Sequence, residues 1–167
     1  QGLGQGAQPI ISYNYGAGNS NRVRRAYRLL LTCSVCYAML FCLLIQLFPG
    51  VFAAIFTSNA ELLAFTKPML RIYTLALGLF GIQIACQMTF TSLGNAKASI
   101  IVAVMRKFIL LLPLIYIMPH LYTADLTKAV FMAEPVADVL AVAFTGVLFS
   151  FEFRKALRAM PKSEKKS

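Results

Sequence analysis

The chain has 167 residues, of which 59% are hydrophobic and 13% are charged, and its net charge is +10. Soluble domains are about 45–50% apolar and about 25% charged, so this composition excludes a disordered chain and a disulfide-stapled scaffold and argues against a soluble globular fold. In a soluble protein, a charge of +10 would suggest a nucleic-acid partner. The positions of the basic residues decide between these readings.

The first region of the chain comprises residues 1–25. Its apolar part, residues 1–15, is shorter than the roughly 20 residues that a membrane-spanning helix needs. The sequence starts at Gln1, without a methionine or a signal-peptide pattern. We expect this region to be the cytoplasmic end of a preceding helix followed by a basic loop, and the sequence to be a piece of a longer protein.

Four long apolar segments follow within residues 26–153. A helix of about 20 residues rises about 30 Å, which matches the hydrocarbon core of a bilayer. Only helices and closed barrels satisfy the backbone in lipid, and these segments lack the alternation of barrel strands. We therefore expect an all-α integral membrane protein with four complete transmembrane helices and the end of a fifth. The four are predicted at about residues 26–48, 69–93, 98–119 and 129–151.

The connection between the first two predicted helices is itself apolar, which favours a short helix at the membrane interface. Residues 58–61 have capping-box spacing, so a new helix should begin at Asn59 and run into the second spanning helix with a bend near Pro68. Pro113 and Pro135 predict kinks in the third and fourth helices. Some transporters use such kinks for motion and other membrane helices tolerate them without function, so both interpretations stay open.

The basic residues lie mainly on one side of the predicted membrane. Thirteen of the 16 Lys and Arg residues fall in alternate connections and in the C-terminal tail, and three fall in the other connections. This asymmetry follows the positive-inside rule and predicts a cytoplasmic C-terminus, with residues 154–167 as a basic cytoplasmic tail. A nucleic-acid partner is then no longer needed to explain the charge.

The sequence offers no constellation typical of a soluble enzyme. Cys33 and Cys36 have C-x-x-C spacing, but they lie inside the first spanning helix with no histidine or second pair beside them, which favours helix packing over redox or metal chemistry. His120 follows Pro119 at the outer end of the third helix, a position typical of an interfacial residue. We expect neither a catalytic site nor a metal site.

Two carboxylates stand out inside the fourth spanning helix. Glu134 and Asp138 are spaced i, i+4 on one face; at about 1.5 Å per residue from the outer end, they lie roughly 7 Å and 13 Å deep. Two carboxylates this close in a dry site do not both ionise easily, which suits a proton carrier or a cation ligand. Alternatively, either could pair with Arg106 or Lys107, although we expect those two side chains to extend toward the cytoplasmic surface.

A second polar stripe runs along the predicted second helix. Gln83, Gln87 and Thr91 share one face at i, i+4 and i+8. Neutral side chains of this kind can hydrogen-bond a substrate or hold water in a cavity, and they can equally bond to neighbouring helices. Because no single chemistry follows from either group, a transport pathway is a better inference than catalysis.

Short motifs also occur along the chain in a fixed order. They are residues 8–19 followed by Arg22, Arg24 and Arg25; Phe48 and Pro49; residues 56–59 with Glu61; residues 70–73; Gln83; residues 92–97; and residues 134–138. Together they resemble the end of the eighth helix and the ninth to twelfth helices of MATE (multidrug and toxic compound extrusion) transporters, across essentially the whole chain.

This resemblance implies the C-terminal lobe of a twelve-helix, two-lobed transporter in the bacterial inner membrane. Such proteins are not enzymes; they are secondary active antiporters that export cationic or amphipathic drugs in exchange for H⁺ or Na⁺ by alternating access. The implied partners are drug molecules, the lipid bilayer and the N-terminal helices of the same protein, with no cofactor besides the coupling ion and no nucleic acid.

Two alternatives remain beside the antiporter: a lipid-flippase relative from the same superfamily and a membrane scaffold without transport. Some branches of the family carry an acidic residue a few positions before the equivalent of Gln83. This chain has Phe80, Gly81 and Ile82 there. The resemblance therefore leaves the choice between H⁺ and Na⁺ open.

Overall fold

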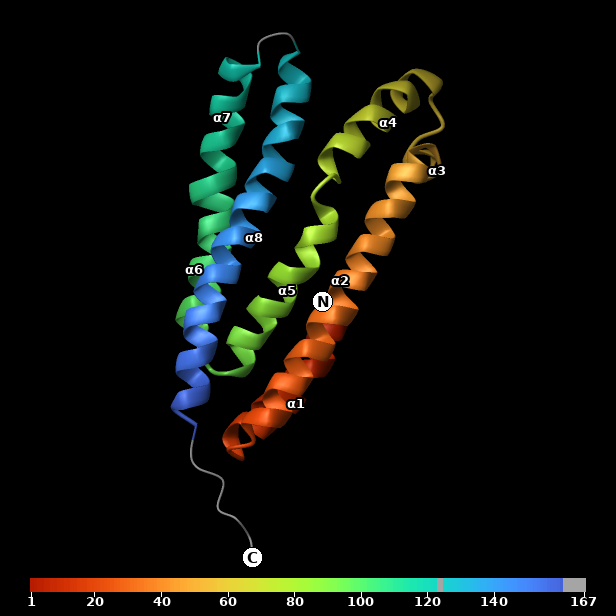
Figure 1. Cartoon of the computed structure of the whole chain (residues 1–167). Helices are drawn as coiled ribbons and strands as arrows, with labels where there is room; N and C mark the ends of the chain where they lie inside the picture. Colours follow the sequence, from red (N-terminus) through yellow and green to blue (C-terminus); the bar gives the residue numbers. More distant parts are fainter. Residues whose placement is uncertain (123–124, 161–167) are drawn as a thin grey trace, which may run out of the picture.

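The computed structural model describes residues 1–122 and 125–160, and every element in these ranges is a helix (Figure 1). In chain order the elements are α1 (Gly2–Gly16), α2 (Ser20–Leu47), α3 (Pro49–Ala54), α4 (Ala60–Tyr73), α5 (Leu77–Ser92), α6 (Ala96–Val104), the π-helix η1 (Met105–Leu111), α7 (Leu112–Leu121) and α8 (Leu126–Arg158). The predicted helix start at Asn59 is confirmed, because its side chain accepts hydrogen bonds from the amides of Glu61 and Leu62 at 2.9 and 3.4 Å.

The helices form an elongated bundle in which α5 occupies the middle (Figure 1). One side of α5 packs along α2, with α1 against both of them at the end where the tail leaves α8. The other side of α5 packs against α8, which also contacts η1 and α7. The helix pair α8 and η1 therefore adjoins α5, and this arrangement positions the polar groups described below.

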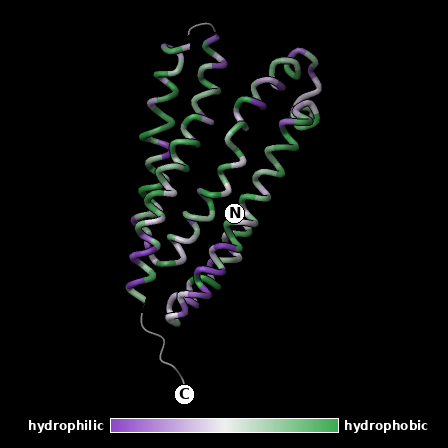
Figure 2. Tube along the Cα trace, in the orientation of Figure 1, coloured by the Kyte–Doolittle hydropathy of each residue, from purple (hydrophilic) through white to green (hydrophobic). Residues whose placement is uncertain are grey.

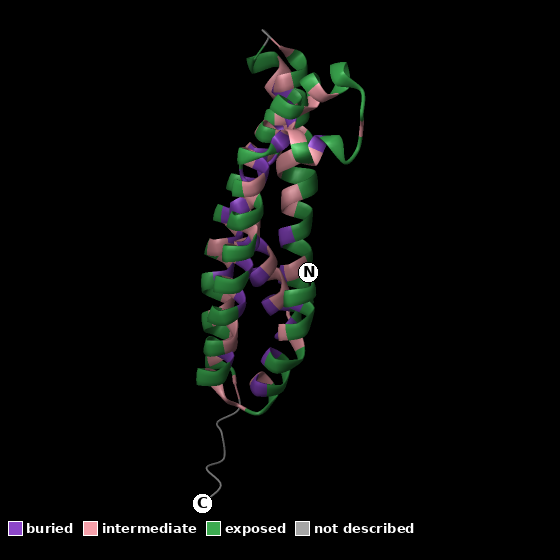
Figure 3. Cartoon of the chain, turned by 90° about the vertical axis from the view of Figure 1, so that its right-hand side faces the viewer, coloured by how far each residue is buried: buried purple, intermediate pink, exposed green. Residues whose placement is uncertain are grey.

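Three rods are long and apolar enough to cross a membrane: α2, the continuous stretch Ala96–Leu121 and α8. Helices α4 and α5 form a fourth candidate span when they are taken together. Hydrophobic residues cover the lengths of these helices and hydrophilic residues gather toward their ends (Figure 2). Many residues along the helices are exposed (Figure 3), and they include large apolar side chains such as Phe108 and Tyr116. The predicted all-α membrane fold is confirmed over the described residues.

The second predicted span differs from expectation, because residues 69–93 do not form one helix. The chain breaks between Tyr73 and Leu77 and bends there by 49°, whereas Pro68, the expected bend, lies inside α4. Side chains of α2 supply the physical reason. Gln46 Nε2 donates to the carbonyl oxygen of Arg71 at 2.8 Å, and Cys42 Sγ lies 3.5 Å from the carbonyl oxygen of Thr74. The Arg71 carbonyl, freed by the break, needs such a partner inside a membrane, whereas the Thr74 carbonyl also accepts from the Leu77 amide at 3.0 Å.

The other two prolines that predicted kinks, Pro113 and Pro135, occupy different positions in their helices. Pro113 stands in the first turn of α7, directly after the π-helix, so the irregular part of the third span precedes the proline. Pro135 lies inside α8, which continues as one helix of 33 residues. The altered helix geometry is therefore found around Arg106 and Lys107.

Two turns between helices share one backbone geometry. Gly18 and Gly94 have φ angles of 73° and 74°, a region that favours glycine because it lacks a Cβ. The residue after each glycine is an asparagine whose backbone N–H donates to the carbonyl five residues earlier. These bonds run from Asn19 to Asn14 and from Asn95 to Phe90, both at 2.9 Å. These turns reverse the chain from α1 into α2 and from α5 into α6.

Candidate functional site

A charged cluster joins η1 to α8 inside the membrane-spanning part of the fold. Arg106 Nε lies 2.7 Å from Asp138 Oδ1, and Arg106 Nη2 lies 3.1 Å from Glu134 Oε1. The three side chains are only 14%, 8% and 13% exposed for Arg106, Asp138 and Glu134. We refer to these three residues as the acidic cluster.

The acidic cluster forms because of the residue spacing along α8 and because η1 packs against α8. Glu134 and Asp138 are one turn apart on α8, so both face the same side. Arg106 is the second residue of η1, which packs against α8. A π-turn holds more residues than an α-turn, and single π-turns frequently occur at functional sites.

A ring from a third element completes the environment of Arg106. Its guanidinium carbon lies 4.6 Å from the centre of the Phe80 ring on α5. A cation over an aromatic face is attracted by the ring's quadrupole, and the attraction grows when water is excluded. Helices α5, η1 and α8 thus meet at one arginine side chain.

The cluster corrects the expectation that both basic side chains of the third span extend toward the surface. Arg106 turns to α8, while Lys107 is exposed. The physical reason is that two carboxylates buried without a cation would be very costly, and the guanidinium can bond both at once. With all three groups ionised, two negative charges oppose one positive charge, so the formal charge is −1 and one further H⁺ or monovalent cation would neutralise the cluster.

The predicted stripe on the second span, Gln83, Gln87 and Thr91, separates into different environments. Gln83 is 3% exposed, and its Oε1 has no hydrogen-bond partner in the described part of the chain. Gln87 is half-buried, and Thr91 is exposed with its hydroxyl bonded to the carbonyl of Gln87 at 3.1 Å. Of the three, only Gln83 presents an unpaired buried acceptor, and neither Gln87 nor Thr91 bonds to the acidic cluster.

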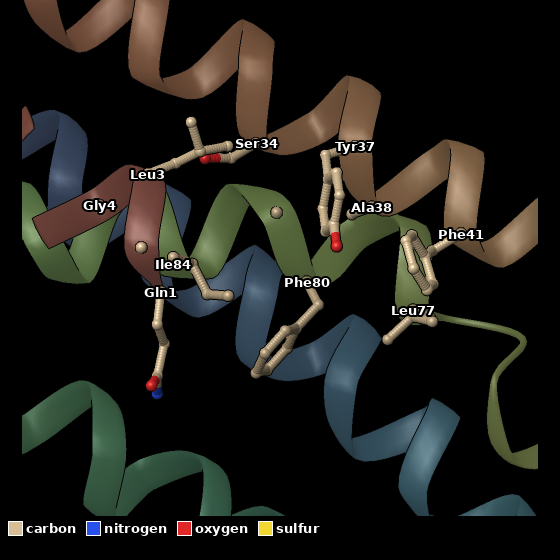
Figure 4. A pocket seen from close by; sticks show the side chains of 12 residues that line it. Gln1, Leu3, Gly4, Ser34, Tyr37, Ala38, Phe41, Leu77, Phe80 and Ile84 are labelled. Atoms are coloured by element: carbon tan, nitrogen blue, oxygen red, sulfur yellow. The ribbon is translucent and has the colours of Figure 1, made fainter. Parts of the chain in front are cut away.

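A groove of about 470 Å³ is lined by residues of α2 and α5 and by residues 1–4 at the start of α1 (Figure 4). Most of its lining is apolar, and the rings of Tyr37, Phe41 and Phe80 stand around it. Phe80 therefore belongs both to the groove and to the surroundings of Arg106. From the sequence, Phe80 is notable only as part of the stretch where some branches of the family carry an acidic residue, and its contact with Arg106 requires knowledge of which helices are neighbours.

The cysteines and the histidine take no part in either feature. Cys33 and Cys36 are exposed on α2, Cys86 is buried, and His120 is exposed near the end of α7. Among the residues that the structure describes, no group of three His, Cys, Asp or Glu side chains could hold a metal ion. The Tyr27 hydroxyl lies 3.7 Å from Cys86 Sγ, which gives that thiol a polar neighbour.

Comparison with known proteins identifies the fold. A family model described as MatE matches residues 1–117. An inward-facing multidrug resistance MATE family transporter of the MOP superfamily has a TM-score of 0.83 and 18% identity, covering 92% of this chain and 35% of that one. The MATE multidrug transporter DinF-BH, in complex with R6G, has a TM-score of 0.82 and 31% identity, covering 94% and 34%.

A third structure agrees. The Vibrio cholerae MATE transporter VcmN, in its bent form, has a TM-score of 0.77 and 22% identity, covering 91% of this chain and 33% of that one. The chain thus spans about a third of the length of these transporters. A search of curated protein sequences found no match. Because the family model matches well over half of the chain and the fold agrees, the chain belongs to the MatE family, the family of the MATE multidrug transporters.

Proposed function

We propose that this chain is part of a secondary active antiporter that exports cationic or amphipathic drugs in exchange for H⁺ or Na⁺ by alternating access. The observation that carries the proposal is the acidic cluster, which is buried within the spanning helices and in which two carboxylates share one guanidinium. Ionisable groups inside a membrane are costly and mark ion or substrate pathways. The drug-bound relative DinF-BH supports the substrate class.

The acidic cluster supplies a two-state element for coupling. Arg106 holds Glu134 and Asp138 together when both carboxylates are ionised. A proton on one carboxylate, or a Na⁺ ion between them, removes part of the attraction for the guanidinium and loosens η1 from α8. An ion that binds one arrangement better than the other shifts the population toward it, which is the requirement for coupling.

The groove beside Tyr37, Phe41 and Phe80 suits the organic part of a drug. Its volume of about 470 Å³ falls within the range of about 300–1,000 Å³ that is typical of small-molecule sites. Aromatic faces attract organic cations. Because Phe80 lines the groove and also contacts Arg106, a drug in the groove and an ion at the acidic cluster would both affect the position of the Phe80 ring. Gln83, Gln87 and Thr91 stay proposed as pathway residues on the same helix.

The charge distribution supports the proposed orientation. The arginines that open α2 and those that close α8 lie at the same end of the bundle, which the positive-inside rule assigns to the cytoplasm. This orientation would put the C-terminus in the cytoplasm; the location in the bacterial inner membrane is proposed from the resemblance to MATE transporters.

The test is Asp138→Asn in the complete protein, produced at wild-type level in cells that lack their own efflux pumps. The matched control is Glu152→Gln, which removes a carboxylate from the same helix outside the acidic cluster. We expect drug resistance and efflux to fall by about tenfold or more in Asp138→Asn, in line with common coupling energies, and to persist in the control. Wild-type efflux by Asp138→Asn would remove this residue from the mechanism.

A further inference from the structure

Four arginines from two helices converge at one end of the bundle. Arg24 and Arg28 lie in the first turns of α2, and Arg154 and Arg158 lie in the last turns of α8. They line two adjoining clefts of about 250 and 360 Å³, and both clefts share Arg24, Arg154 and the side chain of Leu157. We call these four residues the arginine cluster.

The arginine cluster has no anionic partner of its own in residues 1–122 and 125–160. None of its members takes part in an ion pair there. Glu152, on α8 beside them in sequence, accepts a hydrogen bond from Asn95 Nδ2 at 2.9 Å instead. Within each helix the arginines are spaced i, i+4, an arrangement in which like charges repel. Four exposed guanidiniums held together in this way favour a bound anion.

Apolar side chains border the same clefts. Tyr27 and Phe153 line the smaller cleft, and their ring centres are 5.2 Å apart. Phe153 stacks on Phe149 at 4.8 Å. Phe151 is 71% exposed and lines a third cleft together with Arg154 and Arg158. Figure 2 shows the hydrophilic residues at this end giving way to hydrophobic ones along the helices. The site therefore has the arginine side chains on one side and apolar aromatic side chains on the other.

We propose that the arginine cluster binds the phosphate of an anionic phospholipid and thereby links α2 to α8. Guanidinium groups match phosphate oxygens with two parallel hydrogen bonds, which a lysine cannot provide. Basic pockets between transmembrane helices are suited to anionic headgroups, and long apolar neighbours can receive the acyl chains. A soluble phosphate would use the guanidiniums alone, whereas a lipid would also place its acyl chains against Phe153 in the smaller cleft and against Phe151, which lines a third cleft with Arg154 and Arg158. The observations therefore favour a lipid.

The consequence is a lipid requirement that is independent of the ion pathway. The acidic cluster lies on η1 and the middle of α8, whereas the arginine cluster lies at the ends of α2 and α8. A lipid bridging these ends would hold α2 and α8 together without touching Asp138. Loss of the lipid should therefore reduce stability even in a variant that cannot transport.

The experiment is a lipid titration of the complete, detergent-purified protein, followed by native mass spectrometry and thermal unfolding. The probes are phosphatidylglycerol, phosphatidylcholine and inorganic phosphate. Arg24→Gln/Arg154→Gln removes the two residues shared by both clefts. Arg22→Gln/Arg25→Gln is the control, since it removes the same charge from exposed positions on α2 that line neither cleft.

We expect the wild type and the control to bind phosphatidylglycerol in preference to phosphatidylcholine and to gain thermal stability from it. In Arg24→Gln/Arg154→Gln, affinity for phosphatidylglycerol should fall by about tenfold, while unfolding without lipid stays like that of the control. An equal loss of affinity in both variants, or no preference between the lipids, would overturn the proposal. Stabilisation by inorganic phosphate alone, as strong as that by lipid, would replace the lipid with a soluble anion.

Discussion

Arg106 donates through Nε to Asp138 Oδ1 at 2.7 Å, and this bond crosses from the π-helix of the third span to the middle of the fourth. The same guanidinium donates to Glu134 Oε1 at 3.1 Å. One side chain therefore joins η1 to α8 and partners both carboxylates.

Removing the guanidinium should destabilise the protein strongly. In Arg106→Gln two buried carboxylates lose their cation, a change that costs about 3–5 kcal/mol for a buried pair. The matched control is Lys107→Gln, which neutralises the exposed neighbour. We expect a clear fall in unfolding temperature for Arg106→Gln in lipid nanodiscs and almost none for the control.

A second variant separates charge balance from packing at the same position. Adding Asp138→Asn to Arg106→Gln removes one of the unpaired charges, so the double variant should be more stable than Arg106→Gln alone. Equal stability of Arg106→Gln and Lys107→Gln, with no effect of the second substitution, would show that the ion pairs do not hold η1 to α8.

The backbones of α2 and α5 lie close together at Gly81. A Cβ built at Gly81 lies 2.5 Å from the backbone oxygen of Ser34 and 2.9 Å from the Cα of Val35. Gly81→Ala must therefore push the helices apart, and overpacking of this kind costs about 1–3 kcal/mol. Gly146→Ala is the control, because nothing lies within 4 Å of its added Cβ.

We expect Gly81→Ala to unfold at a lower temperature than wild type and Gly146→Ala to be unchanged or slightly more stable, since alanine favours helix. The measurement is thermal unfolding of both variants in the same detergent. An equal effect of the two substitutions would mean that the two helices are not in backbone contact at this position.

Asp125 caps the start of α8, and this contact makes a prediction about its acidity. Its carboxylate accepts from the Lys128 amide at 3.1 Å and pairs with the Lys128 ammonium at 3.1 Å. The backbone hydrogen bond, followed by the side-chain bond to Lys128, lowers the pKa of Asp125 below its ordinary value of 3.8. A carboxyl whose pKa is lower in the folded protein than in the unfolded chain stabilises the fold at any pH above the unfolded-state pKa. This stabilisation is lost as the pH falls through the folded-state pKa.

The pKa of Asp125 can be measured by carbon NMR of ¹³C-labelled aspartate in nanodiscs. We expect a value below 3.8 in the wild type and a partial return toward it in Lys128→Ala, which keeps the backbone amide and removes the ammonium. Thr127→Ala serves as the neighbouring control. An Asp125 that titrates at its ordinary value in the wild type would contradict the capping contact.

The existence of the spans could be predicted from the sequence because it depends on composition along the chain. The break between Tyr73 and Leu77 could not, since Pro68 is the stronger local signal and the partners that stabilise the break, Gln46 and Cys42, come from another helix. A helix boundary set by contacts across the bundle leaves no mark at its own position in the sequence.

Only the two carboxylates of the acidic cluster could be placed together from the sequence; the π-turn that carries Arg106 could not be predicted. The i, i+4 spacing places Glu134 and Asp138 on one face. Counting at about 1.5 Å per residue from the outer ends of the predicted spans puts Asp138 roughly 13 Å and Arg106 roughly 20 Å deep on consecutive helices. A long arginine side chain can cover that difference, so the pairing is one of the alternatives that the sequence leaves open. The π-turn that carries Arg106 has no signal in the sequence, because proline stands after it rather than within it.

The most direct measurement is drug-driven ion flux in proteoliposomes that contain the complete protein and a dye for H⁺ or Na⁺. R6G, the ligand in the DinF-BH complex, serves as the drug. Wild type and Glu152→Gln should move H⁺ or Na⁺ only when the drug is present, and Asp138→Asn combined with Glu134→Gln should abolish this flux. Undiminished drug-driven flux in that double variant would contradict the assignment of the coupling site to the acidic cluster.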